Sequence, residues 1–156
     1  MLIAAASSCA GAMGGLYFSK RVKARAAYYE ALVGFINQII SEIKFRKNPI
    51  KIIAEEYMKM KVSALNTHLT EYVQSPNPTS LQLSRGVLKP NELERVRLFL
   101  ESLGTLDSET QILELEAHKE KFSLEAKKTL EHQQKFSGMY VKLGFFAGLA
   151  LGIIIL

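Results

Sequence analysis

Histidine is the residue type in this chain best suited to acid–base work or metal binding, and there are three: His68, His118 and His132. The last two lie fourteen residues apart on one predicted helix. That spacing is about 21 Å at 1.5 Å per residue, too far for both side chains to share a metal ion. Glu114 and His118 are one helical turn apart, but a di-metal bundle needs several such pairs that face inward. We therefore expect a solvated helix face and no metal site.

The remaining reactive side chains give no catalytic pattern either. Glu55 and Glu56 are adjacent, so on a helix they point in different directions and do not form a natural catalytic dyad. Cys9 is the only cysteine, which excludes an intramolecular disulfide, and its apolar surroundings favour a packing role. The sequence contains no glycine-rich phosphate loop and no nucleophile elbow. It therefore predicts a protein that is not an enzyme and needs no cofactor.

Both ends of the chain are uncharged, in residues 1–19 and in residues 143–156. Nineteen helical residues reach about 28 Å, close to the roughly 30 Å of a bilayer's hydrocarbon core. The final run reaches that length if it starts at Ser137, with the Lys142 side chain extending to the headgroups. We therefore predict transmembrane helices at residues 1–19 and 137–156. Small residues recur every fourth position in both and predict helix-packing faces: Ser7, Gly11 and Gly15, and Gly144, Gly148 and Gly152.

The net charge of +5 is concentrated next to the first apolar run. Residues 20–51 contain eight Lys and Arg against two Glu. Basic residues that flank a span mark the cytoplasmic side and bind anionic lipid, which predicts headgroup contacts for Lys20, Arg21, Lys23 and Arg25. Nucleic-acid binding is disfavoured because no aromatic–basic module accompanies the charge. Residues 20–136 are thus expected to form a cytoplasmic helical bundle in an all-α, membrane-anchored protein.

The pattern of residues 20–136 predicts the helices of this bundle. Apolar residues spaced by three and four positions indicate a long helix over residues 20–45 and another from about residue 107 onward. These two helices should leave one membrane face antiparallel, with the shorter middle helices packed against them. Asn48 and Pro49 suit the start of the next helix, Gly104 suits a helix stop, and Asp107 suits an N-cap. Residues 81–88 are expected to form a short helix.

Three local patterns resemble one protein family in their order along the chain. The first is Glu42-Ile43-Lys44-Phe45 followed by Asn48-Pro49-Ile50, and the second is Leu103-Gly104-Thr105-Leu106-Asp107 with Gln111. The third is Leu143-Gly144-Phe145-Phe146-Ala147-Gly148-Leu149 in the last apolar run. Together they resemble the stage III sporulation protein AB family of spore-forming Gram-positive bacteria. The cytoplasmic domain of that family is similar to the helical domain of inner-membrane platform proteins of type II secretion and type IV pilus systems.

The resemblance implies a non-catalytic platform in the mother-cell membrane around the forespore, within a secretion-like channel complex. It implies docking of a cytoplasmic hexameric ATPase, contact with other membrane subunits of the channel, and a possible homo-oligomer. Among the matching positions, Glu42 and Gln111 have no evident folding role in the sequence, and we expect them to edge the ATPase-facing surface. The alternative that the sequence leaves open is a membrane-anchored helical adaptor or assembly subunit of an unrelated membrane complex.

Overall fold

The computed structural model describes the backbone of residues 2–46, 48–76 and 80–154, and the side chains of residues 20–46, 48–76 and 80–131. In this described backbone five helices follow one another: α1 (Leu2–Phe45), α2 (Ile50–Met60), α3 (Leu65–Gln74), α4 (Pro90–Ser102) and α5 (Ser108–Ile154). No strand occurs in the described backbone. The predicted all-α class is therefore confirmed.

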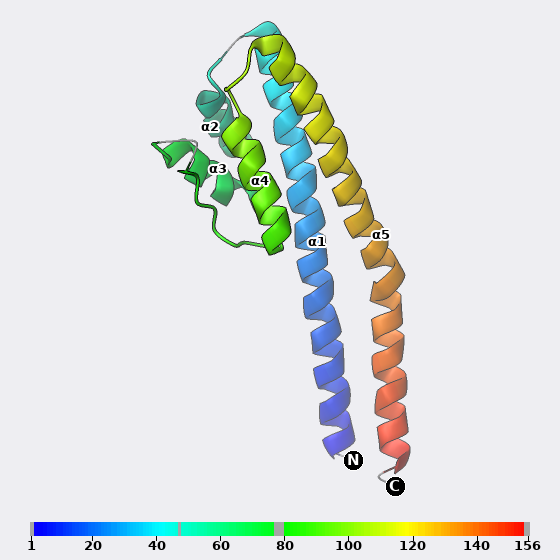
Figure 1. Cartoon of the computed structure of the whole chain (residues 1–156). Coiled ribbons are helices and arrows are strands. Elements are labelled where there is room, and N and C mark those ends of the chain that lie inside the picture. The colour runs from blue at the N-terminus through cyan, green and yellow to red at the C-terminus, as the bar shows by residue number, and fades with distance from the viewer. Residues whose placement is uncertain (1, 47, 77–79, 155–156) are drawn as a thin grey trace.

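Helices α1 and α5 run antiparallel beside each other, and their free ends lie at the same end of the molecule (Figure 1). The apolar positions that predicted these helices face one another. Leu32, Ile36 and Leu115 are fully buried, and the Tyr29 and Phe122 rings stack with their centroids 6.1 Å apart. The predicted antiparallel pair of long helices is therefore present.

The three short helices form a second layer on one side of this pair, at the end away from the free termini (Figure 1). The ring of Phe99, from α4, lies 5.4 Å from that of Phe122 on α5. Tyr57, from α2, lies 5.4 Å from Phe35 on α1 and donates a 2.7 Å hydrogen bond to the Ala31 carbonyl. Each short helix thus buries aromatic or aliphatic side chains against α1 or α5. These include Ile53 and Ala54 of α2, Leu65 and Leu69 of α3, and Val96 and Leu100 of α4.

The predicted helix over residues 81–88 is wrong, because this segment is not helical. Near the end of α3, the Val73 carbonyl accepts a bond from Lys51 at the start of α2, whereas α4 begins beside Arg25 of α1. The connection must therefore run back along the length of α4. An extended chain covers about 3.3 Å per residue and a helix only about 1.5 Å. Leu81 and Leu88, the apolar residues at the two ends of this segment, are nevertheless buried. They anchor the loop to the bundle.

Within the predicted spans at residues 1–19 and 137–156, residues 2–19 lie on helical backbone of α1 and residues 137–154 on helical backbone of α5. Their side chains lie outside the described residues, and so do the packing positions Ser7, Gly11, Gly15, Gly144, Gly148 and Gly152. Within the described part of the chain, no helix combines the length and apolar character needed to cross a bilayer. Both spans therefore stay predictions.

Gly34 gives a direct test of how α2 packs on α1. A Cβ atom added at Gly34 would lie 2.9 Å from the Tyr57 hydroxyl, which its bond to Ala31 holds in place, whereas the next ring atom is 3.8 Å away. We expect Gly34→Ala to destabilise the fold by about 1 kcal/mol, despite the better helix propensity of Ala. In a Tyr57→Phe background the same change should instead stabilise it by roughly 0.5–1 kcal/mol. Urea unfolding followed by circular dichroism measures both; equal effects in the two backgrounds would contradict this packing.

Candidate functional site

The turn between α1 and α2 is closed by Glu42. Its Oε2 accepts a 3.1 Å hydrogen bond from Asn48 Nδ2, and its Oε1 lies 3.5 Å from the Arg46 guanidinium. Asn48 therefore does not cap α2 as predicted; Pro49 occupies the N-cap position and makes no side-chain cap bond. Glu42 thus has a folding role. The sequence did not reveal it, because the Glu42–Asn48 hydrogen bond joins residues on the two sides of a turn.

The turn between α4 and α5 is closed by Gln111. Gly104 has a φ of +78°, a left-handed conformation that favours glycine, and its N–H donates a 2.9 Å bond to Gln111 Oε1. Gln111 is only 3% exposed, so its side chain holds the turn and is not presented to a partner. Asp107 Oδ2 accepts the Thr110 N–H at 3.1 Å, and this bond lowers the pKa of the Asp107 carboxyl. Asp107 thus caps α5 as expected.

These two turns are neighbours. A Cβ atom at Gly104 would lie 3.5 Å from Ile50 Cδ1, at the start of α2. Figure 1 shows both turns at the end of the α1–α5 pair opposite the free termini. We call this region, residues 42–46, 48–50 and 103–113, the distal end. The five residues predicted for partner binding or helix boundaries, Glu42, Pro49, Gly104, Asp107 and Gln111, all belong to it.

The distal end also exposes three large apolar side chains. Phe45 is 82% exposed, Leu113 is 68% exposed and Leu106 is 40% exposed. They come from the end of α1, the second turn of α5 and the turn that precedes α5. A single exposed apolar residue is ordinary, but three at one end suggest a contact surface. The sequence offered a signal for two of them, since Phe45 and Leu113 fall outside the apolar stripes of their helices.

The four basic residues predicted to contact lipid divide into two groups. Lys20, Arg21 and Lys23 are exposed. Arg25 points into the bundle, where its guanidinium lies 3.5 Å from Glu92 Oε1 and donates to Thr129 Oγ1 at 3.3 Å. The predicted headgroup contact of Arg25 is therefore corrected to an internal link between α1, α4 and α5. Glu92 is only 5% exposed, and a buried carboxylate without a paired cation is strongly destabilising, so Arg25 stabilises its burial.

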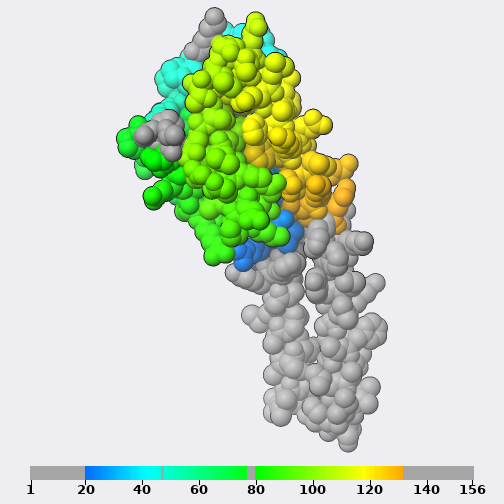
Figure 2. All heavy atoms as spheres, viewed as in Figure 1, coloured from blue at the N-terminus to red at the C-terminus, as the bar shows by residue number. Residues whose placement is uncertain are grey.

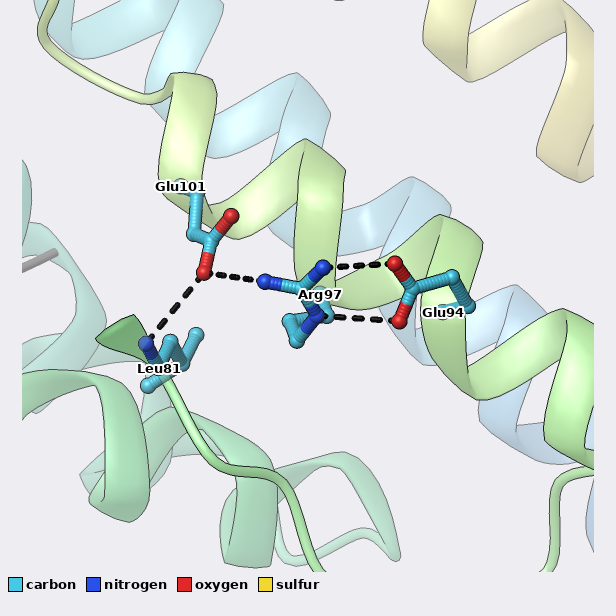
Figure 3. A network of polar contacts seen from close by, with 4 residues as sticks. All are labelled: Leu81, Glu94, Arg97 and Glu101. Atoms are coloured by element: carbon cyan, nitrogen blue, oxygen red, sulfur yellow. Dashed lines mark hydrogen bonds and ion pairs between the residues drawn. The ribbon is translucent and has the colours of Figure 1, made fainter. Parts of the chain in front are cut away.

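Two further polar networks hold the long loop between α3 and α4. Arg97 forms two bonds to Glu94 and one to Glu101, whose Oε1 also accepts the Leu81 N–H at 3.2 Å (Figure 3). In the second network, the His68 Nε2–H donates a 2.8 Å hydrogen bond to the Ser84 carbonyl. The His68 Nδ1 must then accept the Tyr28 hydroxyl, 2.7 Å away. His68 is thus committed to structure, and burial raises the pKa of Tyr28.

The His118 ring contacts both the Phe99 and the Phe122 ring, at centroid distances of 5.0 and 5.8 Å. Partial burial, followed by the charge of Lys121, lowers its pKa, while Glu114 acts in the opposite direction. The side chains of residues 20–46, 48–76 and 80–131 contain no group of three or more His, Cys, Asp or Glu that could hold a metal. His118 therefore serves as an aromatic packing residue, and Cys9 and His132 lie outside these side chains.

The described residues define an all-helical bundle whose turns are closed by side-chain hydrogen bonds and whose distal end exposes apolar side chains. The family model for stage III sporulation protein AB matches residues 1–156, and the chain belongs to that family. Membership is consistent with a role in sporulation. No curated protein matches the chain. No solved structure matches it either.

Gln111 should matter for stability through the bond that it accepts. Gln111→Ala leaves the Gly104 N–H without that acceptor and should cost about 1–3 kcal/mol in the free energy of unfolding. A matched change at the neighbouring exposed Thr110, Thr110→Ala, keeps its backbone bond to Asp107 and should cost under about 0.5 kcal/mol. Chemical denaturation compares the two. Equal losses would show that the Gln111 bond does not stabilise the turn.

His118 should make the stability depend on pH. Because the folded pKa is lowered, the unfolded chain binds a proton more readily, so stability is complete above the unfolded pKa of about 6.5 and falls as the pH drops below it. His118→Gln removes this titration. We expect the variant to lose less stability than the wild type between about pH 7 and pH 5. Parallel denaturation curves at the two pH values test this, and identical losses would contradict it.

Proposed function

We propose that this protein is a non-catalytic platform that is held in the mother-cell membrane by both termini and docks a cytoplasmic ATPase at its distal end. The ATPase is the hexameric partner that the family resemblance implies. Other membrane subunits of a secretion-like channel between mother cell and forespore are then its second set of partners. The proposal rests on family membership, on the placement of the termini and on the surface of the distal end.

The observation that carries the proposal is that the free ends of α1 and α5 lie together (Figure 1). The uncharged residues 1–19 and 143–156 belong to those ends. Two spans that leave the same end of an antiparallel pair enter one membrane face without a crossover. The described bundle then stands on that face, and its distal end is its farthest part from the membrane.

The chemistry of the distal end supports docking. Phe45, Leu106 and Leu113 offer apolar area, and Glu42 and Asp107 add carboxylates held by turn hydrogen bonds. Apolar anchors surrounded by ordered polar groups are typical of protein–protein contact sites. The Glu42 side chain is 12% exposed and contributes only the edge of such a surface, while Gln111 holds the turn beneath it.

The long helices give this platform a way to pass motion to the membrane. The 44 residues of α1 form one continuous helix of about 66 Å. Helix α5 is also continuous, over 47 residues. A push from the ATPase at the distal end would move both helices together, because packed helices shift as units and do not deform continuously. The channel subunits would receive that displacement from the spans.

Removing the exposed apolar groups should weaken docking without unfolding the domain. We expect the double variant Phe45→Ser, Leu113→Ser to keep its unfolding free energy within about 1 kcal/mol, because both side chains are largely exposed. Its capture of the purified ATPase should fall at least about tenfold, the loss typical of interface anchors. Pull-down from detergent-solubilised membranes measures this.

The matched control replaces two apolar residues of similar exposure elsewhere, Leu98→Ser on α4 and Val62→Ser before α3, which are 53% and 96% exposed. This pair should leave ATPase capture unchanged. Equal capture by wild type, test pair and control pair would refute docking at the distal end. The adaptor of an unrelated membrane complex would then be the better description.

A further inference from the structure

Exposed basic side chains gather at the other end of the bundle, where α1 and α5 continue toward their free ends. Lys20, Arg21 and Lys23 are exposed on α1. On α5, Lys127 and Lys128 are exposed and directly precede Thr129. Arg25 donates to Thr129 Oγ1 at 3.3 Å, so the basic residues of the two helices lie at about the same level.

The loop before α4 adds two cations to this end, although it lies far from both helices in the sequence. Arg85 and Lys89 are exposed. The Lys89 N–H donates to Glu92 Oε2 at 2.9 Å, and the other oxygen of that carboxylate lies 3.5 Å from Arg25. Arg25 is five residues along α1 from Lys20, a rise of about 7.5 Å. The end of the loop at Lys89 thus reaches nearly to the level where the charged part of α1 begins.

Figures 1 and 2 agree on this placement. In Figure 1 the loop descends from α3 and enters α4 at the lowest point of the α2–α4 layer. In Figure 2 that green segment lies on the surface beside the first described residues of α1, drawn in blue. The loop therefore belongs to the face of the bundle that is directed toward the free ends.

The nearby carboxylates leave these cations unneutralised. Glu92 is occupied by Arg25 and Glu125 by Arg95, each at 3.5 Å. Among the described residues, neither Arg85 nor Lys89 forms an ion pair with a carboxylate. Glu71, which accepts the Ser84 N–H, and the exposed Glu131 of α5 are then two negative charges against the basic residues of three segments. Because the excess positive charge is spread over α1, α5 and the loop, it fits an anionic partner large enough to contact all three segments.

We propose that the loop of residues 84–89 is a third membrane contact, in which Arg85 and Lys89 bind the headgroups of anionic phospholipids. This inference rests on the proposed insertion of both termini into a bilayer. The rise of about 7.5 Å along α1 from Lys20 to the level of Lys89 is shorter than the Debye length, which is about 8 Å at physiological salt. A charge at Lys89 is therefore not fully screened from a membrane surface at the level of Lys20. Each basic residue near an anionic surface strengthens the contact about fivefold.

The loop is built to hold such a contact. The Ser84 N–H donates to both carboxylate oxygens of Glu71, and the Ser84 carbonyl accepts from His68. Gly86 has a φ of +45°, which turns the chain toward α4. Contacts through α1, α5 and this loop would fix the tilt of the bundle, since three points that are not in line define a plane. The distal end would then be held at a constant angle to the membrane.

A quenching experiment on the full chain tests the proposal. In a Cys9→Ser background, a dye is attached through Ser84→Cys, or through Glu109→Cys at the distal end, and the protein is reconstituted in vesicles with headgroup-spin-labelled lipid. In equal parts phosphatidylglycerol and phosphatidylcholine, quenching should be strong at position 84 and weak at position 109. Phosphatidylcholine alone, or Arg85→Glu with Lys89→Glu, should reduce quenching at position 84 about fivefold or more.

The control variant Lys44→Glu with Lys121→Glu changes the net charge equally, at exposed positions on α1 and α5 away from the loop, and should leave quenching at position 84 unchanged. Equal quenching at positions 84 and 109, or no effect of lipid charge and of the loop variant, would overturn the loop contact. Flotation of the same vesicles separates this from failure of the proposed function. Protein that floats without quenching at position 84 refutes the loop contact alone, whereas protein that does not float refutes membrane anchorage and with it the contact.

Discussion

The structure depends on the packing of α1 against α5, because every other element is attached to one of these two helices. The centre of this contact is the stacked pair Tyr29 and Phe122, to which Phe99 of α4 adds an edge-on ring. Burial of one such side chain contributes about 1.5–3 kcal/mol, so the aromatic cluster alone is comparable to the net stability of a small domain. Antiparallel packing also brings the two free ends together, and this arrangement underlies the proposed role.

The polar groups inside the bundle determine where its loops and turns lie. Glu92 fixes the start of α4 on α1 and α5, His68 and Glu71 hold Ser84, and Gln111 closes the distal turn. A buried polar group without a partner costs about 1–3 kcal/mol, so each of these bonds excludes other arrangements of its loop. The apolar core thus provides cohesion, while the polar contacts select one geometry for the two ends.

The two ends of the bundle differ in chemistry because they face different surroundings in the proposed function. The distal end combines exposed Phe45, Leu106 and Leu113 with turns held by side-chain hydrogen bonds, as suits a protein partner. The opposite end carries basic side chains from α1, α5 and the loop before α4, as suits an anionic surface. Helices α1 and α5 run without a break between the two ends, which is what the proposed transfer of motion to the membrane requires.

The sequence by itself determined the helices and several of their ends. Apolar spacing predicts the long helices, Gly104 and Asp107 mark a helix stop and a start, and the motifs indicate the family, because these signals are local or periodic. Tertiary structure alone decided the rest. It turned Arg25 inward to Glu92, buried Gln111 against the Gly104 N–H, left residues 81–88 without a helix and brought Ile50 next to Gly104. Each of these outcomes depends on contacts between residues that are distant in sequence or separated by a turn, which spacing along one helix cannot encode.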